Sequence, residues 1–260
     1  MYAVLSWLLV ATTALFGLFA TGGNDGKKES AANPEPKTSA YVVMPVQNGG
    51  AVSGTITYSG KAAAPKKLAV TKDTQVCGKT EHVDESLVVA AAGGIKDVIV
   101  SIKGVKGGKG LEALGANFVL DQKGCLYSPH VSIVPINVAV EILNPDGILH
   151  NIHTYSKKNP PFNKSQPQFK KKMTTTFTAP ELIVAKCDVH GWMSSNILVV
   201  DHPYHAVTDA KGAFTIKDVP PGTYTVEFWQ EKLGTKTAQV TVTAGQAATL
   251  NFAFPAAAAN

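Results

Sequence analysis

Short β-branched runs alternate with turn residues along the chain from residue 51 onward. The runs are AVSGTITYSG, IKDVIVSIKGV, HVSIVPINVAVEIL, LIVAKC, NILVV, AFTIKDV, TYTVEFW, AQVTVT and TLNFAF. Residues 223–228 and 238–243 alternate with a period of two, so one face of each strand is buried and the other is wet. A weak helical signal covers only residues 111–115. We therefore predict an all-β protein built from antiparallel sandwiches or Greek-key barrels.

The N-terminal residues 2–20 are almost entirely apolar and long enough to cross a bilayer. We predict a cleaved signal peptide or a retained membrane anchor over residues 1–21. Thr21 stands where a lipid-bearing cysteine would be, so lipidation is not expected there. Residues 22–49 are rich in Gly, Pro, Ser and Lys, as in a flexible linker. We expect an exported protein, periplasmic or at the cell surface, anchored to the membrane by residues 2–20.

The charge of the chain is unusual because all 24 basic residues are lysine, giving a net charge of +5. Base recognition relies on the arginine fork, so nucleic-acid binding is not expected. Hydrophobic residues make up 45% of the chain and charged residues 17%, which excludes a disordered polymer. The sequence holds no phosphate loop, nucleophile elbow or paired-carboxylate motif. We do not expect an enzyme.

The most specific chemical signal is the segment Cys187-Asp-Val-His190-Gly-Trp-Met193, which lies between the runs LIVAK and NILVV. A thiolate, an imidazole and a thioether on one short loop suit a copper ion that cycles between Cu(I) and Cu(II). A second histidine is available at His150, just after the run VAVEIL. The ligands would then join two parts of the sandwich.

This pattern resembles that of the cupredoxins, the blue copper family, over about residues 118–200. The C-x2-H-x2-M loop is similar to that of amicyanins, with Gly-Trp in place of Pro-Phe, and the His-Asn pair resembles the first-ligand motif of plastocyanins. The resemblance implies a Greek-key sandwich and one type 1 copper ion. It also implies the ligands, which are His150, Cys187, His190 and Met193, the last being axial.

The resemblance assigns roles to two further residues. Asn151 would tie the two ligand loops together by hydrogen bonds. Trp192 would line the electron path, with His190 at the loop surface as the exit edge. Four protein ligands leave no open position for a substrate, so the implied role is electron transport. His153 stays open as an alternative ligand or a surface group.

The remaining cysteines and histidines admit alternatives. With Cys187 as the copper thiolate, Cys77 and Cys125 remain to form a disulfide, which an exported compartment permits. The competing possibility is a second metal site that uses Cys125 and His130. The segment His202-Pro-Tyr-His205 is open to metal binding or to packing between domains.

The C-terminal part resembles a carboxypeptidase regulatory-like (transthyretin-like) sandwich. The pattern consists of Thr208-Asp209-x2-Gly212-x-Phe214 followed by Val219-Pro-Pro-Gly-Thr-Tyr224. Asp209 and Gly212 would form a hairpin turn, and Phe214 and Tyr224 would fill the core. Residues 50–60 resemble the first strand of the same module. We therefore predict a cupredoxin domain at 61–201, inserted between that strand and a module at 202–255.

A cluster of lysines follows His150, the first candidate ligand, and no acidic residue interrupts the cluster. Its members are Lys157, Lys158, Lys164, Lys170, Lys171 and Lys172. Such a rim can steer an acidic redox partner, for example a cytochrome or a membrane oxidoreductase complex. The leading hypothesis is a membrane-tethered carrier of single electrons. The alternatives are a copper-containing docking subunit of a larger membrane redox complex and a copper storage or delivery protein.

Overall fold

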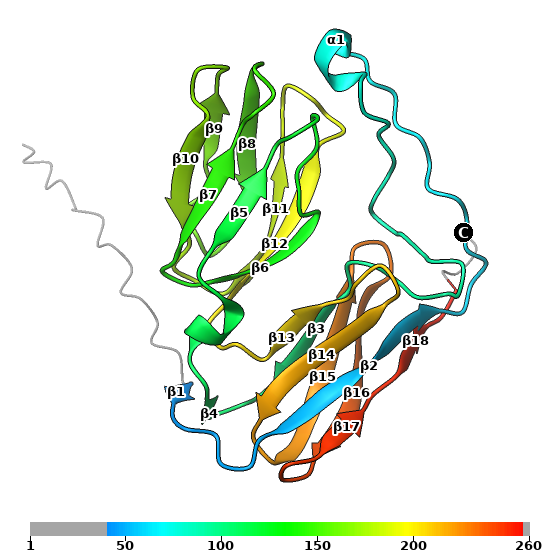
Figure 1. The fold of residues 1–260 in the computed structure, drawn as a ribbon, viewed down its shortest axis with the longest axis vertical. Coiled ribbons are helices and arrows are strands. Elements are labelled where there is room, and N and C mark those ends of the chain that lie inside the picture. Colours follow the sequence, from blue (N-terminus) through cyan, green and yellow to red (C-terminus); the bar gives the residue numbers. More distant parts are fainter. Residues whose placement is uncertain (1–40, 257–260) are drawn as a thin grey trace, which may run out of the picture. The chain divides into compact units, whose positions relative to one another are not determined.

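The computed structural model describes residues 41–256 (Figure 1). The predicted signal or anchor at 1–21 and the linker up to residue 40 lie outside these residues. Within the described range, no helix is long and apolar enough to span a membrane. Helical structure there is confined to α1 (Thr74–Cys77) and a 3₁₀ turn, η1 (Leu111–Leu114). The all-β prediction is confirmed.

One sandwich consists of a three-stranded and a five-stranded sheet, with orders β10-β7-β5 and β6-β12-β11-β8-β9. The bounds are β5 (Phe118–Asp121), β6 (Val131–Pro135), β7 (Ala139–Leu143), β8 (His150–Tyr155), β9 (Asn163–Gln166), β10 (Lys172–Thr176), β11 (Glu181–Lys186) and β12 (Ser194–Val200). Leu120 and Ile142 of the smaller sheet share one core with Ile152, Ile183 and Ile197 of the larger sheet. We call this the first sandwich.

The second sandwich consists of two four-stranded sheets, ordered β13-β3-β15-β16 and β14-β2-β17, with β18 also paired to β2. The bounds are β2 (Gly50–Tyr58), β3 (Ile99–Lys103), β13 (His205–Val207), β14 (Ala213–Val219), β15 (Gly222–Gln230), β16 (Gly234–Val242), β17 (Ala247–Thr249) and β18 (Phe252–Phe254). A separate parallel pair joins β1 (Val42–Val43) to β4 (Gly107–Gly108). Two sandwiches are therefore present.

The second sandwich takes strands from both ends of the described chain. β2 pairs with β14 in register Thr55↔Ala213, and all strands of the first sandwich lie between these two in sequence. β3 corrects the predicted boundary of 61–201, because it pairs with β13 and β15 rather than with the first sandwich. Its residues Ile99 to Ile102 are buried on both faces. Such an apolar run predicts a central strand without indicating which sheet it joins.

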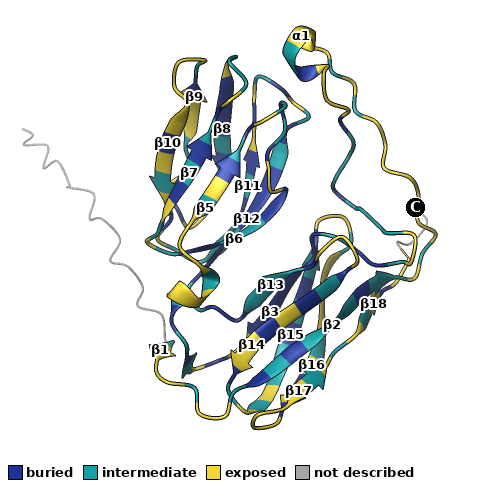
Figure 2. Cartoon of the chain, in the orientation of Figure 1, coloured by how far each residue is buried: buried dark blue, intermediate teal, exposed yellow. Residues whose placement is uncertain are grey.

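The predicted turn at Asp209 explains the local geometry of the second sandwich. The Asp209 carboxylate accepts hydrogen bonds from the backbone amides of Lys211 (2.8 Å) and Ala213 (2.9 Å). These two bonds hold the pKa of Asp209 below its ordinary value. Gly212 adopts a φ of 79°, which glycine tolerates best. Beyond the turn, buried and exposed residues alternate along β14 until a register shift before Val219 (Figure 2).

Gly54 provides a test of this packing, because Leu250, between β17 and β18, lies directly against it. A Cβ atom at this position would lie 2.0 Å from the carbonyl oxygen of Leu250. We predict that Gly54→Ala lowers the free energy of unfolding by about 1–3 kcal/mol through overpacking. Urea denaturation measures the change. Ser53→Ala, on the opposite face of β2, is the control and should change stability by less than about 0.5 kcal/mol; equal effects would contradict the prediction.

Candidate metal centre

The candidate ligands come from one strand start and one loop of the first sandwich. His150 is the first residue of β8, whereas Cys187, His190 and Met193 lie between β11 and β12. β8 and β11 are antiparallel, with His153 opposite Lys186, so the start of β8 lies beside the end of β11. The pairing register therefore brings the two ligand segments together.

Two backbone hydrogen bonds close the ligand loop. The amide of Met193 donates to the carbonyl of His190 (2.9 Å), and the amide of Cys187 donates to the carbonyl of Met193 (3.3 Å). The loop is consequently a compact turn that returns the chain directly into β12. Met193 is 1% exposed and belongs to the same core as Cys187.

Three donor atoms converge inside the protein. The ligand atoms of His150, Cys187 and His190 all lie within 4.8 Å of one another. Nδ1 of His150 is 3.0 Å from Nδ1 of His190, which in turn is 3.8 Å from Sγ of Cys187. All three side chains are buried, at 0%, 2% and 0% exposure for His150, Cys187 and His190. Two imidazole nitrogens and a thiolate in one buried cluster form a donor set that fits copper.

Asn151 ties the two ligand segments together as predicted from the sequence. Its Oδ1 accepts hydrogen bonds from the backbone amides of Asp188 (2.7 Å) and Val189 (3.3 Å). The Sγ of Cys187 also donates to Oδ1, at 3.3 Å. One side chain of β8 thereby fixes the backbone and the thiol of the ligand loop.

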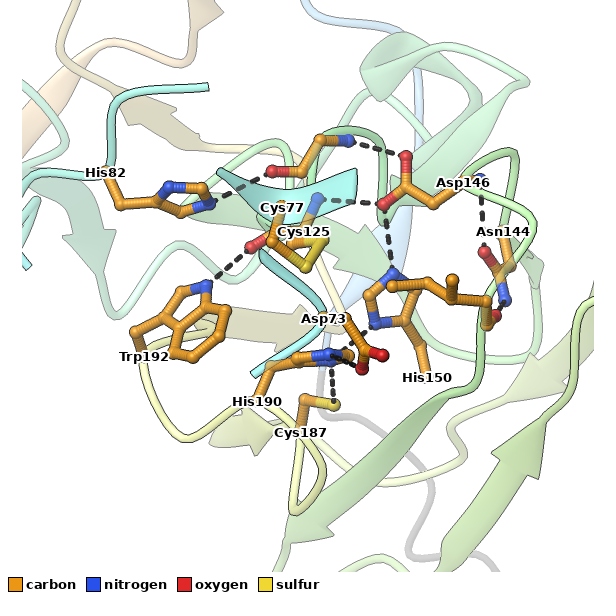
Figure 3. The surroundings of a disulfide bond; sticks show 12 residues. Asp73, Cys77, His82, Cys125, Asn144, Asp146, His150, Cys187, His190 and Trp192 are labelled. Carbon is orange, nitrogen blue, oxygen red and sulfur yellow. Dashed lines mark hydrogen bonds and ion pairs between the residues drawn. A yellow bond between two sulfur atoms is a disulfide. The ribbon is translucent and has the colours of Figure 1, made fainter. Parts of the chain in front are cut away.

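A carboxylate contacts the outer nitrogen of each imidazole ring, an arrangement that the sequence analysis missed (Figure 3). Nε2 of His150 is 3.0 Å from Asp146, and Nε2 of His190 is 2.8 Å from Asp73. A carboxylate at Nε2 keeps the proton on that nitrogen and leaves Nδ1 for a metal. Asp146 lies only four residues before His150, so its spacing was a usable signal. Asp73 lies 117 residues before His190, and no local pattern indicates it.

Burial and hydrogen bonds shift the pKa values of all three residues of the cluster. Burial opposes ionisation of Cys187, but hydrogen bonds from His150 and from the loop backbone outweigh it and lower the pKa of the thiol. Burial also opposes protonation of His150, yet the contacts with Asp146 and Cys187 raise its pKa. Burial lowers the pKa of His190, and the nearby His150 lowers it further.

The other predicted residues around the centre lie as follows. Trp192 packs against His190 with ring centroids 5.2 Å apart, and its Nε1 donates to the carbonyl of Cys125 (3.0 Å). His190 itself is not at the loop surface, because it is fully buried beneath Asp73. The expectation that His190 lies at the loop surface is therefore wrong. The ring is buried because the segment that carries Asp73, much earlier in the chain, covers it.

The residues that the sequence offered as alternative metal ligands contact other groups. His153 stacks on Tyr155 and its Nδ1 is 3.2 Å from Asp188, outside the His150 cluster. Cys125 forms a disulfide with Cys77, so its sulfur is not available for a site with His130. Nε2 of His130 is instead 2.8 Å from Glu231.

His202 and His205 stack on each other, with ring centroids 4.4 Å apart. Nδ1 of His205 is 2.8 Å from the hydroxyl of Ser101. Neither histidine belongs to a group of three metal-capable side chains among residues 41–256.

The predicted lysines are all exposed, but they fall into separate groups. Lys157 and Lys158 follow β8, where Glu181 accepts hydrogen bonds from their backbone amides. Lys164 lies over the ring of Phe162 at 4.6 Å. The other three, at the β9–β10 connection and the start of β10, are Lys170, Lys171 and Lys172, and Lys172 forms an ion pair with Glu141.

Comparison with known proteins gives one family match and several structural likenesses. The model of the carboxypeptidase regulatory-like domain matches residues 194–255. No curated protein sequence matches the chain. A copper-containing nitrite reductase from Thermus scotoductus SA-01 is 23% identical over 32% of this chain and 22% of its own, with a TM-score of 0.30. The chain thus spans less than a quarter of that enzyme.

Two smaller copper proteins are similar to part of the chain. A purple cupredoxin from Nitrosopumilus maritimus is 18% identical over 32% of this chain and 100% of its own, with a TM-score of 0.28. A mutant of amicyanin in its oxidised state is 18% identical over 33% of this chain and 83% of its own, with a TM-score of 0.30.

Asn151 generates a prediction for this centre. Replacing it with Ala leaves the loop amides and the Cys187 thiol without their common acceptor. We predict that Asn151→Ala lowers the free energy of unfolding by about 1–3 kcal/mol and Cu(II) affinity by about 10–100-fold. Chelator competition and urea denaturation measure the two effects. The control is Asn163→Ala, an exposed residue that contacts the same Asp188; equal losses of affinity in both variants would refute the assignment.

Proposed function

We propose that the protein carries single electrons by means of one type 1 copper ion. The supporting observation is the buried cluster of two imidazole Nδ1 atoms and one thiol, with Met193 in the same core. The ion, when bound, gains and loses one electron. His150, Cys187 and His190 would hold it, and Met193 would supply a fourth, weaker ligand.

The residues of the centre are held by hydrogen bonds to the surrounding frame. Asn151 fixes the loop, and two carboxylates contact the outer nitrogens of the rings. A frame that stays unchanged between two charge states minimises the reorganisation that electron transfer requires. With four protein ligands, no position is left for a substrate, and we therefore propose a carrier rather than an enzyme.

We also propose that the protein works outside the cytoplasm. The disulfide between Cys77 and Cys125 supports this, because such bonds persist in oxidising compartments. The apolar residues 2–20 support export and tethering at a membrane.

The function is tested first by the colour of the copper protein. Addition of Cu(II) should produce the intense visible absorption of a thiolate bound to Cu(II), with one ion per chain. Cys187→Ser should abolish this band, whereas Met193→Leu should retain it and change the reduction potential. Titration followed by absorption and electron paramagnetic resonance measures both. A colourless protein that binds Cu(I) alone would favour delivery over electron transport.

An acidic redox protein is the proposed partner, with the exposed lysines of the first sandwich as the docking surface. Phe169, which the sequence analysis did not single out, is 81% exposed and immediately precedes Lys170 and Lys171. This apolar ring lies in the connection that follows Gln166, whose partner in the sheet is the ligand His150. An exposed aromatic ring flanked by hydrated charges suits a brief encounter.

Electron exchange should therefore depend on salt. Oxidation of the reduced protein by hexacyanoferrate(III), an anionic probe, should become slower as ionic strength rises, because salt screens the lysines. The double variant Lys170→Glu, Lys171→Glu should lower the rate by about tenfold at low salt. Stopped-flow absorption at the copper band measures the rate. The matched control is Lys236→Glu in β16 of the second sandwich, which should leave the rate unchanged. A rate that depends neither on salt nor on the double change at Lys170 and Lys171 would rule out this surface.

A further inference from the structure

Asp73 lies on a segment that belongs to neither ligand loop, yet it covers a ligand. It precedes α1, with a φ of 48°, and its carboxylate is 2.8 Å from Nε2 of His190. His190 is fully buried there, whereas the Asp73 side chain is 38% exposed. The carboxylate therefore stands between the imidazole and solvent.

The disulfide connects this segment to the other side of the centre. Cys77, the last residue of α1, is bonded to Cys125, which is 48 residues further along the chain. The backbone amide of Cys125 donates to Asp146 (2.8 Å), as does that of Gly124 (2.7 Å). Asp146 in turn contacts Nε2 of His150, and the sulfur of Cys125, the carboxylate and this ring lie within 4.8 Å of one another.

One connected unit, joined by the disulfide and by the amide hydrogen bonds to Asp146, thus presents a carboxylate to each histidine. It begins at Asp73, passes through the disulfide and ends at Asp146, with the two imidazole rings between (Figure 3). We call this unit the carboxylate brace. The Asp73 carboxylate caps no backbone amide of α1, so the end of that helix does not use it.

We propose that Asp73 is a positioning residue of the metal centre: it holds His190 with Nδ1 inward, covers its outer edge and stabilises the oxidised ion over the reduced one. This inference rests on the proposed function. An anion attracts Cu(II) more strongly than Cu(I), and a carboxylate on Nε2 makes the imidazole a stronger donor. The disulfide keeps the carboxylate in place, so His190 is not open to a partner.

The first test uses the copper-loaded full chain. Asp73→Asn should lower Cu(II) affinity by about 10–100-fold and Cu(I) affinity by less, while the thiolate band remains. Each tenfold fall in the ratio of Cu(II) affinity to Cu(I) affinity raises the reduction potential by about 59 mV. Asp73→Glu should restore the potential in part. Asp218→Asn, an exposed aspartate of the second sandwich, removes the same charge and should have no effect. An unchanged potential and affinity in Asp73→Asn would overturn the proposal.

The second test uses the metal-free chain and does not depend on copper. Diethyl pyrocarbonate acylates accessible imidazole nitrogens, and peptide mass spectrometry locates the label. We expect half-exposed His153 to react in every variant, and His190 to react only in Asp73→Ala and in Cys77→Ser, Cys125→Ser. Equal labelling of His190 in wild type and variants would refute the proposal that Asp73 covers His190. The two proposals can fail separately. If wild type shows no visible absorption of thiolate-bound Cu(II) but Asp73 protects His190 from labelling, the proposed function is wrong and the covering role of Asp73 is supported.

Discussion

One amide oxygen, Oδ1 of Asn151, holds the ligand loop onto the sheet, and the geometry of the centre depends on it. The loop leaves β11 immediately after Lys186, so its first amides cannot continue the strand ladder. Buried amides without acceptors are costly, and Asn151 satisfies those of Asp188 and Val189 from the neighbouring strand. The same oxygen aligns the Cys187 thiol. The position of the sulfur is thus set by the requirements of the backbone.

The rigid sandwich extends this control to the two histidines. His150 is fixed by strand pairing with Gln166 and lies in the same sheet as Ile152, a core residue that is 0% exposed. A ring in this environment retains rotation about its Cβ–Cγ bond, and a contact at its outer nitrogen removes that freedom. The partners at Nε2, Asp146 and Asp73, supply this contact. Packing locates the ligands, and hydrogen bonds orient them.

The sequence predicts those parts of the molecule that depend on local chemistry. The segment from Cys187 to Met193 contains three donors within one turn, and the strands on both sides follow from their β-branched runs. The role of Asn151 was implied by the resemblance of the His150-Asn151 pair to a known ligand motif. The turn at Asp209 is likewise contained in a few adjacent residues.

Features that depend on contacts between distant segments were beyond the sequence. The run around Ile99 to Ile102 is equally apolar in either sandwich, and only its pairing with β13 and β15 assigns it to the second. Asp73 lies in a stretch without hydrophobic periodicity, where nothing distinguishes it from other exposed aspartates. The burial of His190 follows from this long-range contact, so the expected surface position of His190 was wrong for the same reason.

Charges of opposite sign act on the proposed reaction at different distances. Asp73 and Asp146 lie in direct contact with the imidazoles, and the interaction between charges is strongest at such short distances. The lysines at 170 and 171 are fully hydrated, and their field extends over about one Debye length, roughly 8 Å at physiological salt. The carboxylates therefore influence the energy of the oxidised state, whereas the lysines influence the rate of encounter. Because the two sets do not share partners, the proposed function lets docking and the energy of the centre vary separately.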